Sequence, residues 1–100
     1  MATHINITLC SSEIYQQVQI TEQDLIDIVS HGIVRPQDMQ AQEWQFEEQV
    51  VTEIARAARL RRDLQINWAG VALALELIEE LEALRKENQE LMRRLQRLEE

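Results

Sequence analysis

The side chains that could bind a metal ion or act as a nucleophile are few and far apart in this sequence. The chain has two histidines, His4 and His31, and a single cysteine, Cys10. A zinc site needs three or four ligands, and a catalytic thiol needs a base beside it. Neither pattern is present, so we predict a protein that is not an enzyme and uses no metal, cofactor or small-molecule substrate. We expect Cys10 to be a small apolar side chain and His31 to lie at a helix end.

The stretch "RAARLRR" is the one cluster that could contact nucleic acid. Its arginines, Arg56, Arg59, Arg61 and Arg62, could neutralise phosphates, which supply most DNA affinity. They could equally form a solvated helix face that complements the helix dipole. The segment placed to read DNA, "ITEQDLIDIVSHG" (residues 20–32), contains three acids and no Lys or Arg. We therefore favour the solvated face and do not expect nucleic acid to be the partner, while a DNA-binding regulator remains the alternative.

The net charge of −8 is concentrated in one half of the chain. Nine acids and one base, Arg35, precede residue 56, whereas the remainder has nine of each. Such a field repels nucleic acid and attracts a basic partner.

The pattern of apolar residues predicts a mainly helical chain, and the low content of Gly (2) and Pro (1) agrees with it. Residues 5–9 are expected to form a short strand with Ile5, Ile7 and Leu9 on one face. A helix capped by Ser11 or Ser12 should follow through about residue 17. Its inward side chains should be Ile14 and Val18.

A second helix is expected to begin after Thr21, because Asp24 stands at the spacing of a capping box. It should end at His31, with Gly32 in the left-handed conformation. Its buried stripe is predicted to be Leu25, Ile28 and Val29.

Residues 32–36 and 43–46 are predicted to pair as a hairpin or wing. A third helix should span residues 47–64, and its apolar side is Val50, Val51, Ile54, Ala58 and Leu64. Trp44, in the wing, could be either a core residue or a contact residue for a partner. Trp68 is expected to pack at the junction with the last helix.

The last helix is expected to begin after Asn67 and to continue to the end of the sequence. Val71, Leu73, Ala74, Leu75, Leu77 and Ile78 should pack on the preceding domain. From residue 77 the apolar spacing alternates four and three, which is typical of a coiled coil. Its predicted dimer seam consists of Leu77, Leu81, Leu84, Asn88, Leu91, Leu95 and Leu98. We therefore expect a homodimer, and Glu80–Arg85 and Arg94–Glu99 pairs favour parallel helices.

Two domains follow from this division, a winged-helix-like domain at 1–66 and the C-terminal helix at 67–100.

The longest apolar run, residues 68–75, is too short to span a bilayer. The stretch "MATHINITLC" does not look like a signal peptide. The expected location is therefore the cytoplasm, with no membrane partner.

The order of these elements resembles the winged helix-turn-helix domain of MerR-type regulators. Thr21, Leu25, Gly32, Ile33 and Val34 match that pattern. Where such regulators have DNA-contacting arginines and a tyrosine pair, this sequence has Gln23, Ile26, Asp27 and Ile28. The resemblance therefore implies the scaffold and puts DNA reading in doubt.

A closer resemblance, to the CbpM family of chaperone modulators, covers nearly the whole chain. It rests on "ITEQDLIDIVSHGIVRP", "EWQF", "RAARLRRDL" and "INWAGVALALELIEELEALRKENQELMRRL". It implies a cytoplasmic bacterial adaptor that binds the J-domain of a DnaJ-like co-chaperone of the CbpA type. The adaptor would inhibit co-chaperone activity and, as a further possibility, affect the DNA binding of CbpA.

The expected partner surface combines an apolar anchor with the acids around it. Ile26 should face solvent beside Glu22, Gln23 and Asp27, and the acids near the wing extend the surface. The predicted partner-binding residues are Glu22, Gln23, Ile26, Asp27, Asp38, Glu43, Trp44, Glu47 and Glu48.

Overall fold

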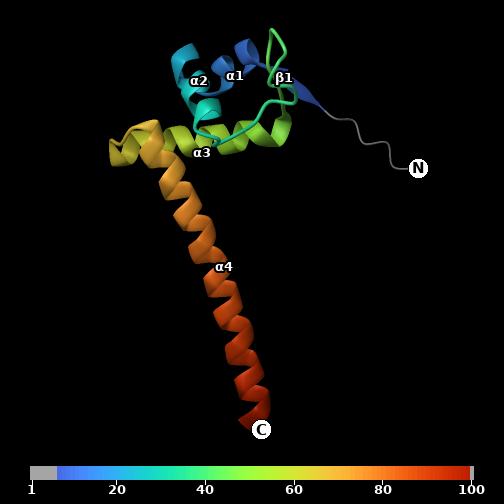
Figure 1. Ribbon diagram of the computed structural model, residues 1–100, viewed down its shortest axis with the longest axis vertical. Helices are drawn as coiled ribbons and strands as arrows, with labels where there is room; N and C mark the ends of the chain where they lie inside the picture. Colours follow the sequence, from blue (N-terminus) through green and yellow to red (C-terminus); the bar gives the residue numbers. More distant parts are fainter. Residues whose placement is uncertain (1–6, 100) are drawn as a thin grey trace, which may run out of the picture.

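The protein consists of a small head and one long helix that projects from it (Figure 1). The structure, a computed structural model, describes residues 7–99. In chain order the elements are β1 (Thr8–Cys10), α1 (Ser11–Gln17), α2 (Glu22–Ser30), β2 (Gln45–Glu47), α3 (Glu48–Leu64) and α4 (Trp68–Glu99). The predicted class, a mainly helical MerR-like domain with a small two-stranded element and a long C-terminal helix, is confirmed.

Helix α1 has the predicted extent but a different cap. The N-cap is Cys10, whose backbone N–H donates to Glu13 Oε1 at 3.2 Å. The Cys10 thiol also contacts Glu13 Oε1 at 3.2 Å and Ser12 Oγ at 3.1 Å. The predictions of a serine cap and of an apolar role for Cys10 were therefore wrong, because the chain turns into the helix one residue earlier and the thiol takes part in the cap.

Helix α2 begins and ends as its sequence predicts. Thr21 Oγ1 accepts from the Asp24 N–H, and Asp24 Oδ2 accepts from the Thr21 N–H, both at 3.0 Å. At the other end Gly32 has φ +72°, and its N–H donates to Val29 O while that of Ile33 donates to Ile28 O. These two bonds form a Schellman motif, which a residue with a Cβ would strain.

The strand at residues 45–47 exists, but its partner is not the predicted one. It pairs antiparallel with β1, with Leu9 opposite Phe46, and residues 32–36 contain no strand. One backbone bond, from Gln37 N to Gln45 O at 2.9 Å, closes residues 37–45 into a projecting loop, which we call the wing-like loop. The strand pairing is thus between distant segments, whereas the prediction relied on a local hairpin.

The hydrophobic core draws on every element of the head and on the first turns of α4. The side chains with less than 2% of their surface exposed are Phe46, Ile14, Leu25, Ile28, Ile54 and Val71. Val18, Val29 and Trp68 are also buried, as predicted. Ile7 is 53% exposed, which contradicts its expected inward position, and Ile5 lies outside the described residues. On α3 the buried side chains are Val51, Ile54 and Ala57, whereas Leu64 is exposed.

Helix α4 packs on the head only through its beginning. The Asn67 side chain caps it by accepting from the Gly70 N–H at 2.8 Å, as predicted. Trp68 and Val71 are buried and Leu75 packs against the core, but Leu73 and Leu77 are exposed, contrary to the expectation that they contact the domain. Beyond residue 80 every described side chain is exposed, and α4 extends away from the head (Figure 1).

Candidate functional site

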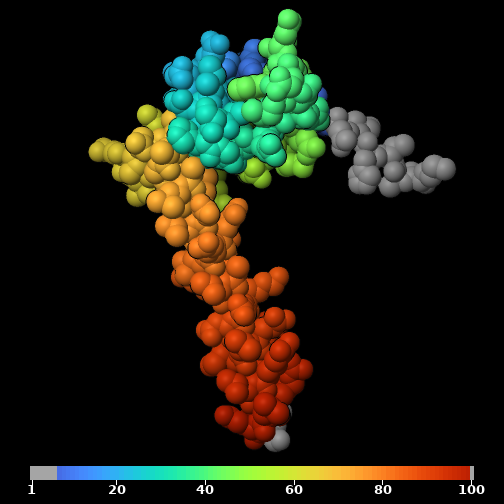
Figure 2. Space-filling view, viewed as in Figure 1, coloured from blue at the N-terminus to red at the C-terminus, as the bar shows by residue number. Residues whose placement is uncertain are grey.

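Four of the nine predicted partner-binding residues line one hollow on the head. Glu22 and Ile26 come from α2, and Glu43 and Trp44 from the end of the wing-like loop. The hollow has a volume of about 430 Å³. Its other lining residues are Ser11, Ser12, Tyr15, Leu25 and Gln42. We call it the α2–loop hollow; the two segments are adjacent parts of the head in Figure 2.

The α2–loop hollow combines apolar surface with two carboxylates. Ile26 is 42% exposed, unlike its buried neighbours Leu25 and Ile28. The Trp44 ring packs edge-on against Phe46, with 6.3 Å between ring centroids, and its Nε1 donates to Met39 O at 3.4 Å. Trp44 is therefore held by the core and presents its remaining surface to the hollow.

The charged side chains that line the α2–loop hollow are both acidic. Its lining contains Glu22 and Glu43 and no Lys or Arg among the residues described. Burial raises the pKa of Tyr15, and the charge of Glu22 raises it further, against a hydrogen bond with Ser11. The Glu22 charge, which disfavours a tyrosinate, would attract a cationic side chain.

Gln23 and Asp27 lie on α2 outside the hollow. Gln23 Nε2 donates to Asp27 Oδ1 at 3.1 Å, so the two side chains form a pair one helical turn apart. The Asp27 carbonyl accepts from the His31 N–H at 3.0 Å and from the His31 ring Nδ1 at 2.8 Å. His31 is the helix C-cap, as expected.

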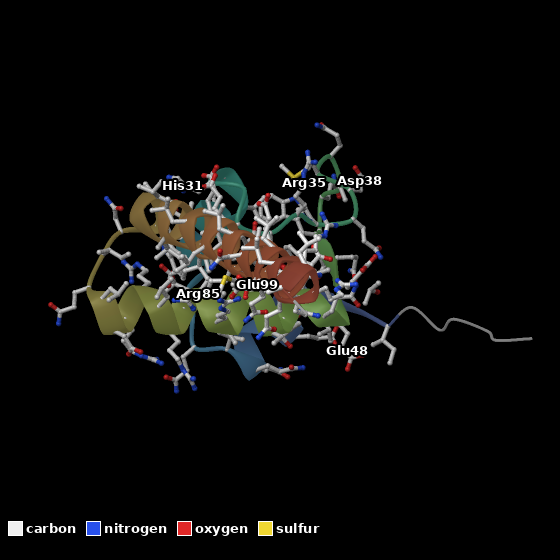
Figure 3. The ribbon with its side chains drawn as sticks, turned by 90° about the horizontal axis from the view of Figure 1, so that it is seen from below. His31, Arg35, Asp38, Glu48, Arg85 and Glu99 are labelled. Atoms are coloured by element: carbon white, nitrogen blue, oxygen red, sulfur yellow. The ribbon has the colours of Figure 1, made fainter. Side chains whose placement is uncertain are left out.

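The remaining predicted acids are dispersed. Asp38 Oδ1 accepts from the Gln40 N–H at 2.9 Å within the wing-like loop, and Glu47 Oε2 accepts from Gln49 Nε2 at 2.7 Å. Figure 3 places Asp38 and Glu48 on separate sides of the head. The nine residues therefore do not form one continuous patch, and the α2–loop hollow is the part that the fold brings together.

Trp68 lies at the junction with the last helix, as predicted, and two contacts that the sequence did not reveal fix α2 against the other helices there. Trp68 Nε1 donates to Asp24 Oδ1 at 3.1 Å, and the Arg61 guanidinium carbon lies 5.1 Å from the centre of the Trp68 ring. Burial acts to raise the pKa of Asp24, but the hydrogen bonds from Thr21 and Trp68, aided by the charge of Arg61, bring that pKa below its usual value. Asp24 thus both caps α2 and holds it to α4.

The predicted seam of α4 is fully accessible in the single chain. Its leucines expose between 48% (Leu81) and 82% (Leu98) of their surface. At 3.6 residues per turn the seam lies on a different face of α4 from Val71 and Leu75, which contact the head. A second helix could therefore pack on the seam without displacing the head.

The described residues contain neither a metal-binding cluster nor a membrane-spanning helix. Residues 7–99 contain no group of three or more His, Cys, Asp or Glu side chains arranged to hold a metal ion. No helix in that range is long and apolar enough to cross a membrane.

Comparison with known proteins agrees with this architecture. The sequence profile of a family described as "MerR HTH family regulatory protein" matches residues 9–93, which includes most of α4. "Chaperone modulatory protein CbpM" of Pseudomonas putida strain W619 is 40% identical over 97 residues, covering 97% of this chain and 96% of the relative. The chain belongs to the CbpM family.

Other CbpM proteins match over similar lengths. That of Pseudomonas entomophila strain L48 is 38% identical over 97 residues. That of Salmonella newport strain SL254 is 37% identical over 94 residues, which cover 94% of this chain and 93% of the relative. The similarity to CbpM therefore extends over both the head and the long helix, as the sequence resemblance implied.

Proposed function

We propose that the chain is a non-catalytic, cytoplasmic chaperone modulator that binds the J-domain of a DnaJ-like co-chaperone of the CbpA type. In this proposal the acidic surface around the α2–loop hollow holds the J-domain and inhibits its co-chaperone activity. The names of the relatives support the modulator role. The J-domain and its inhibition are the expectation attached to the CbpM resemblance.

One observation carries the proposal. On a MerR-like scaffold, the residue types that contact DNA are replaced by an acidic surface on which a partner could dock. Glu22 and Glu43 line one hollow together with exposed Ile26 and half-buried Trp44. A basic helix fits this arrangement, since the carboxylates attract it and Ile26 supplies apolar contact. The excess negative charge of the head would also speed association by electrostatic steering.

We also propose that the chain acts as a homodimer through the seam of α4. Leu77, Leu84 and Leu91 occupy d positions and are exposed in the single chain. Asn88 takes one a position, where an Asn pair specifies register and two strands at some cost in stability. The dimer would carry two heads and so two α2–loop hollows.

The charge-reversed variant Glu22→Lys/Asp27→Lys tests the proposed surface. Calorimetric titration with the recombinant J-domain should give weaker binding than for the unaltered chain, and a smaller dependence on salt, because two attractive charges become repulsive. Glu82→Lys/Glu90→Lys, two reversals at exposed positions of α4 far from the head, is the control with the same change of net charge. If the double variant binds like the control at low and moderate salt, this face is not the binding surface.

The alternative function is DNA binding, which the MerR family description favours. Arg59 and Arg62 are exposed on α3 and available to phosphates. Arg61, however, lies over the Trp68 ring, and α2 carries Glu22, Asp24 and Asp27 where a reading helix needs cations. Submicromolar, sequence-specific binding of a genomic duplex at physiological salt would replace the J-domain proposal.

A further inference from the structure

A second groove lies at the other end of α2, where the helix ends against α3 and α4. It has a volume of about 360 Å³. The residues that line it are His31, Gly32, Ile33, Glu53, Arg56, Ala72, Leu75, Glu76 and Glu79. We call it the α3–α4 groove. Figure 3 shows His31 at the side of the head where α4 begins.

The apolar part of the α3–α4 groove comes from the turn after α2 and from α4. Ile33 follows α2, and Ala72 and Leu75 lie on the second turn of α4. Ile33 and Leu75 are only partly buried against the core, so they leave apolar surface in the groove. This surface is small and suits the methylene stem of a long side chain better than a large aromatic ring.

The polar part of the groove is rich in hydrogen-bond acceptors. Glu53, Glu76 and Glu79 contribute three carboxylates, and Arg56 contributes one cation. Glu53 and Arg56 are three residues apart on the same helix and offset each other. The His31 ring Nδ1 lies 2.8 Å from the Asp27 carbonyl, which can only accept, so the Nε2 of the neutral ring is an acceptor as well.

We propose that the α3–α4 groove is a docking site for a Lys or Arg side chain from a helix of the bound J-domain. The methylene stem would lie on Ile33 and Leu75, and the cationic head would meet Glu76 and Glu79. This inference rests on the proposed J-domain partner and adds a second contact to it. Helix α2 has nine residues, about 13 Å at 1.5 Å per residue, so one small domain can reach the hollows at both of its ends.

A second copy of the chain is a poorer occupant, because of where the groove lies on α4. Relative to Leu77 at a d position, Glu76 is a c position and Glu79 an f position. These positions face away from the partner helix in a two-stranded coiled coil. The groove therefore stays open in the proposed dimer.

The test compares Glu76→Lys/Glu79→Lys with the control Glu82→Lys/Glu90→Lys in the full chain. Glu82 and Glu90 are at outward b and c positions of α4 beyond the groove, so the control has the same change of net charge. The probe is the recombinant J-domain of the CbpA-type co-chaperone from the same genome, titrated in a calorimeter. We expect the double variant to bind about tenfold more weakly, because two attractions become repulsions. The control should stay within about twofold of the unaltered chain.

Nuclear magnetic resonance of the unaltered chain gives a second readout that needs no substitution. Adding the J-domain should shift the amide signals of Gly32, Ile33 and residues 72–79 together with those of the α2–loop hollow. If the lysine variant does not fold, Glu76→Gln/Glu79→Gln takes its place, with a smaller expected loss of affinity in the same direction.

The outcomes separate the inference from the function on which it rests. Equal binding by the double variant and the control, or shifts confined to the α2–loop hollow, overturns the groove and leaves J-domain binding intact. Weaker dimerisation of Glu76→Lys/Glu79→Lys, with unchanged J-domain affinity, would assign the groove to a second copy and also overturn the inference. If the unaltered chain does not bind the J-domain, the proposed function and the groove fail together.

Discussion

Removing two leucines from the α4 seam should abolish dimerisation at micromolar concentrations. Leu84 and Leu91 are 62% and 50% exposed in the single chain, so about half of each side chain remains to be buried by a partner. Full burial of a leucine contributes about 1.5–3 kcal/mol, and half of it about 1 kcal/mol. Leu84→Ala/Leu91→Ala removes four such side chains per dimer and should cost about 4 kcal/mol, which corresponds to a dissociation constant raised about a thousandfold.

Sedimentation equilibrium over a range of concentrations measures this change directly. Leu64→Ala is the control, because Leu64 is 55% exposed on α3 and lies outside the seam. We expect Leu64→Ala to dimerise like the unaltered chain and the double variant to sediment as a monomer. The reasoning is refuted if the double variant still dimerises with unchanged affinity, or if the unaltered chain is a monomer at tens of micromolar, a range in which a stable coiled coil associates.

Two further predictions concern the junction and the direction of the dimer. Because the folded-state pKa of Asp24 lies below its usual value, the carboxylate stabilises the fold above about pH 4 and loses this effect as the pH falls through the folded-state pKa. Asp24→Asn should therefore lower the melting temperature by about 5 °C at neutral pH, measured by circular dichroism with Asp63→Asn as the control. The difference in melting temperature from the unaltered chain should shrink in acid. A difference that stays the same would contradict the role of the Asp24 charge. In a parallel dimer the two copies of residue 98 face each other, so Cys10→Ser/Leu98→Cys should form a disulfide-linked dimer on mild oxidation, seen by non-reducing electrophoresis. Cys10→Ser/Arg93→Cys, with its thiol at an outward position, should not form this dimer. Failure of the Leu98 variant to cross-link would favour the antiparallel arrangement.

Local signals in the sequence predicted those parts of the fold that local interactions determine. The capping box of Thr21 and Asp24, the Schellman glycine Gly32 and the Asn67 cap each involve residues at most five apart. Such contacts depend on side-chain type and spacing, which a single sequence displays. Ile26 was found as a residue of the hollow for the same reason, since it falls outside the buried stripe of an amphipathic helix.

The parts that the sequence did not reveal depend on contacts between distant segments. Strand β2 pairs with Thr8–Cys10, more than thirty residues away, whereas a short extended segment suggests a neighbouring partner. Trp68 was expected to pack at the junction, but its bond to Asp24, 44 residues away, has no local signature. Cys10 was overlooked as a cap because cysteine is not among the usual N-cap residues. The same holds for the α3–α4 groove, whose walls come from two separate helices, α3 and α4, and from the turn after α2.

In the proposed adaptor, the binding surface and the dimer seam lie on different parts of the chain. The excess of acidic over basic side chains lies in the head, and every described side chain of α4 beyond residue 80 is exposed. Asp24, Trp68 and Arg61 connect the two parts by fixing α2 to α3 and to the start of α4. Dimerisation would therefore double the number of docking surfaces without changing the shape of either.

The most direct test of the central claim compares two ligands for the full chain at physiological salt. Calorimetry measures binding of the recombinant J-domain, and fluorescence anisotropy measures binding of random and genomic DNA duplexes. We predict saturable binding of the J-domain that weakens with added salt, and no sequence-specific binding of DNA. No heat of binding with the J-domain, together with tight and sequence-specific binding of one duplex, would contradict the account and identify the chain as a DNA-binding regulator.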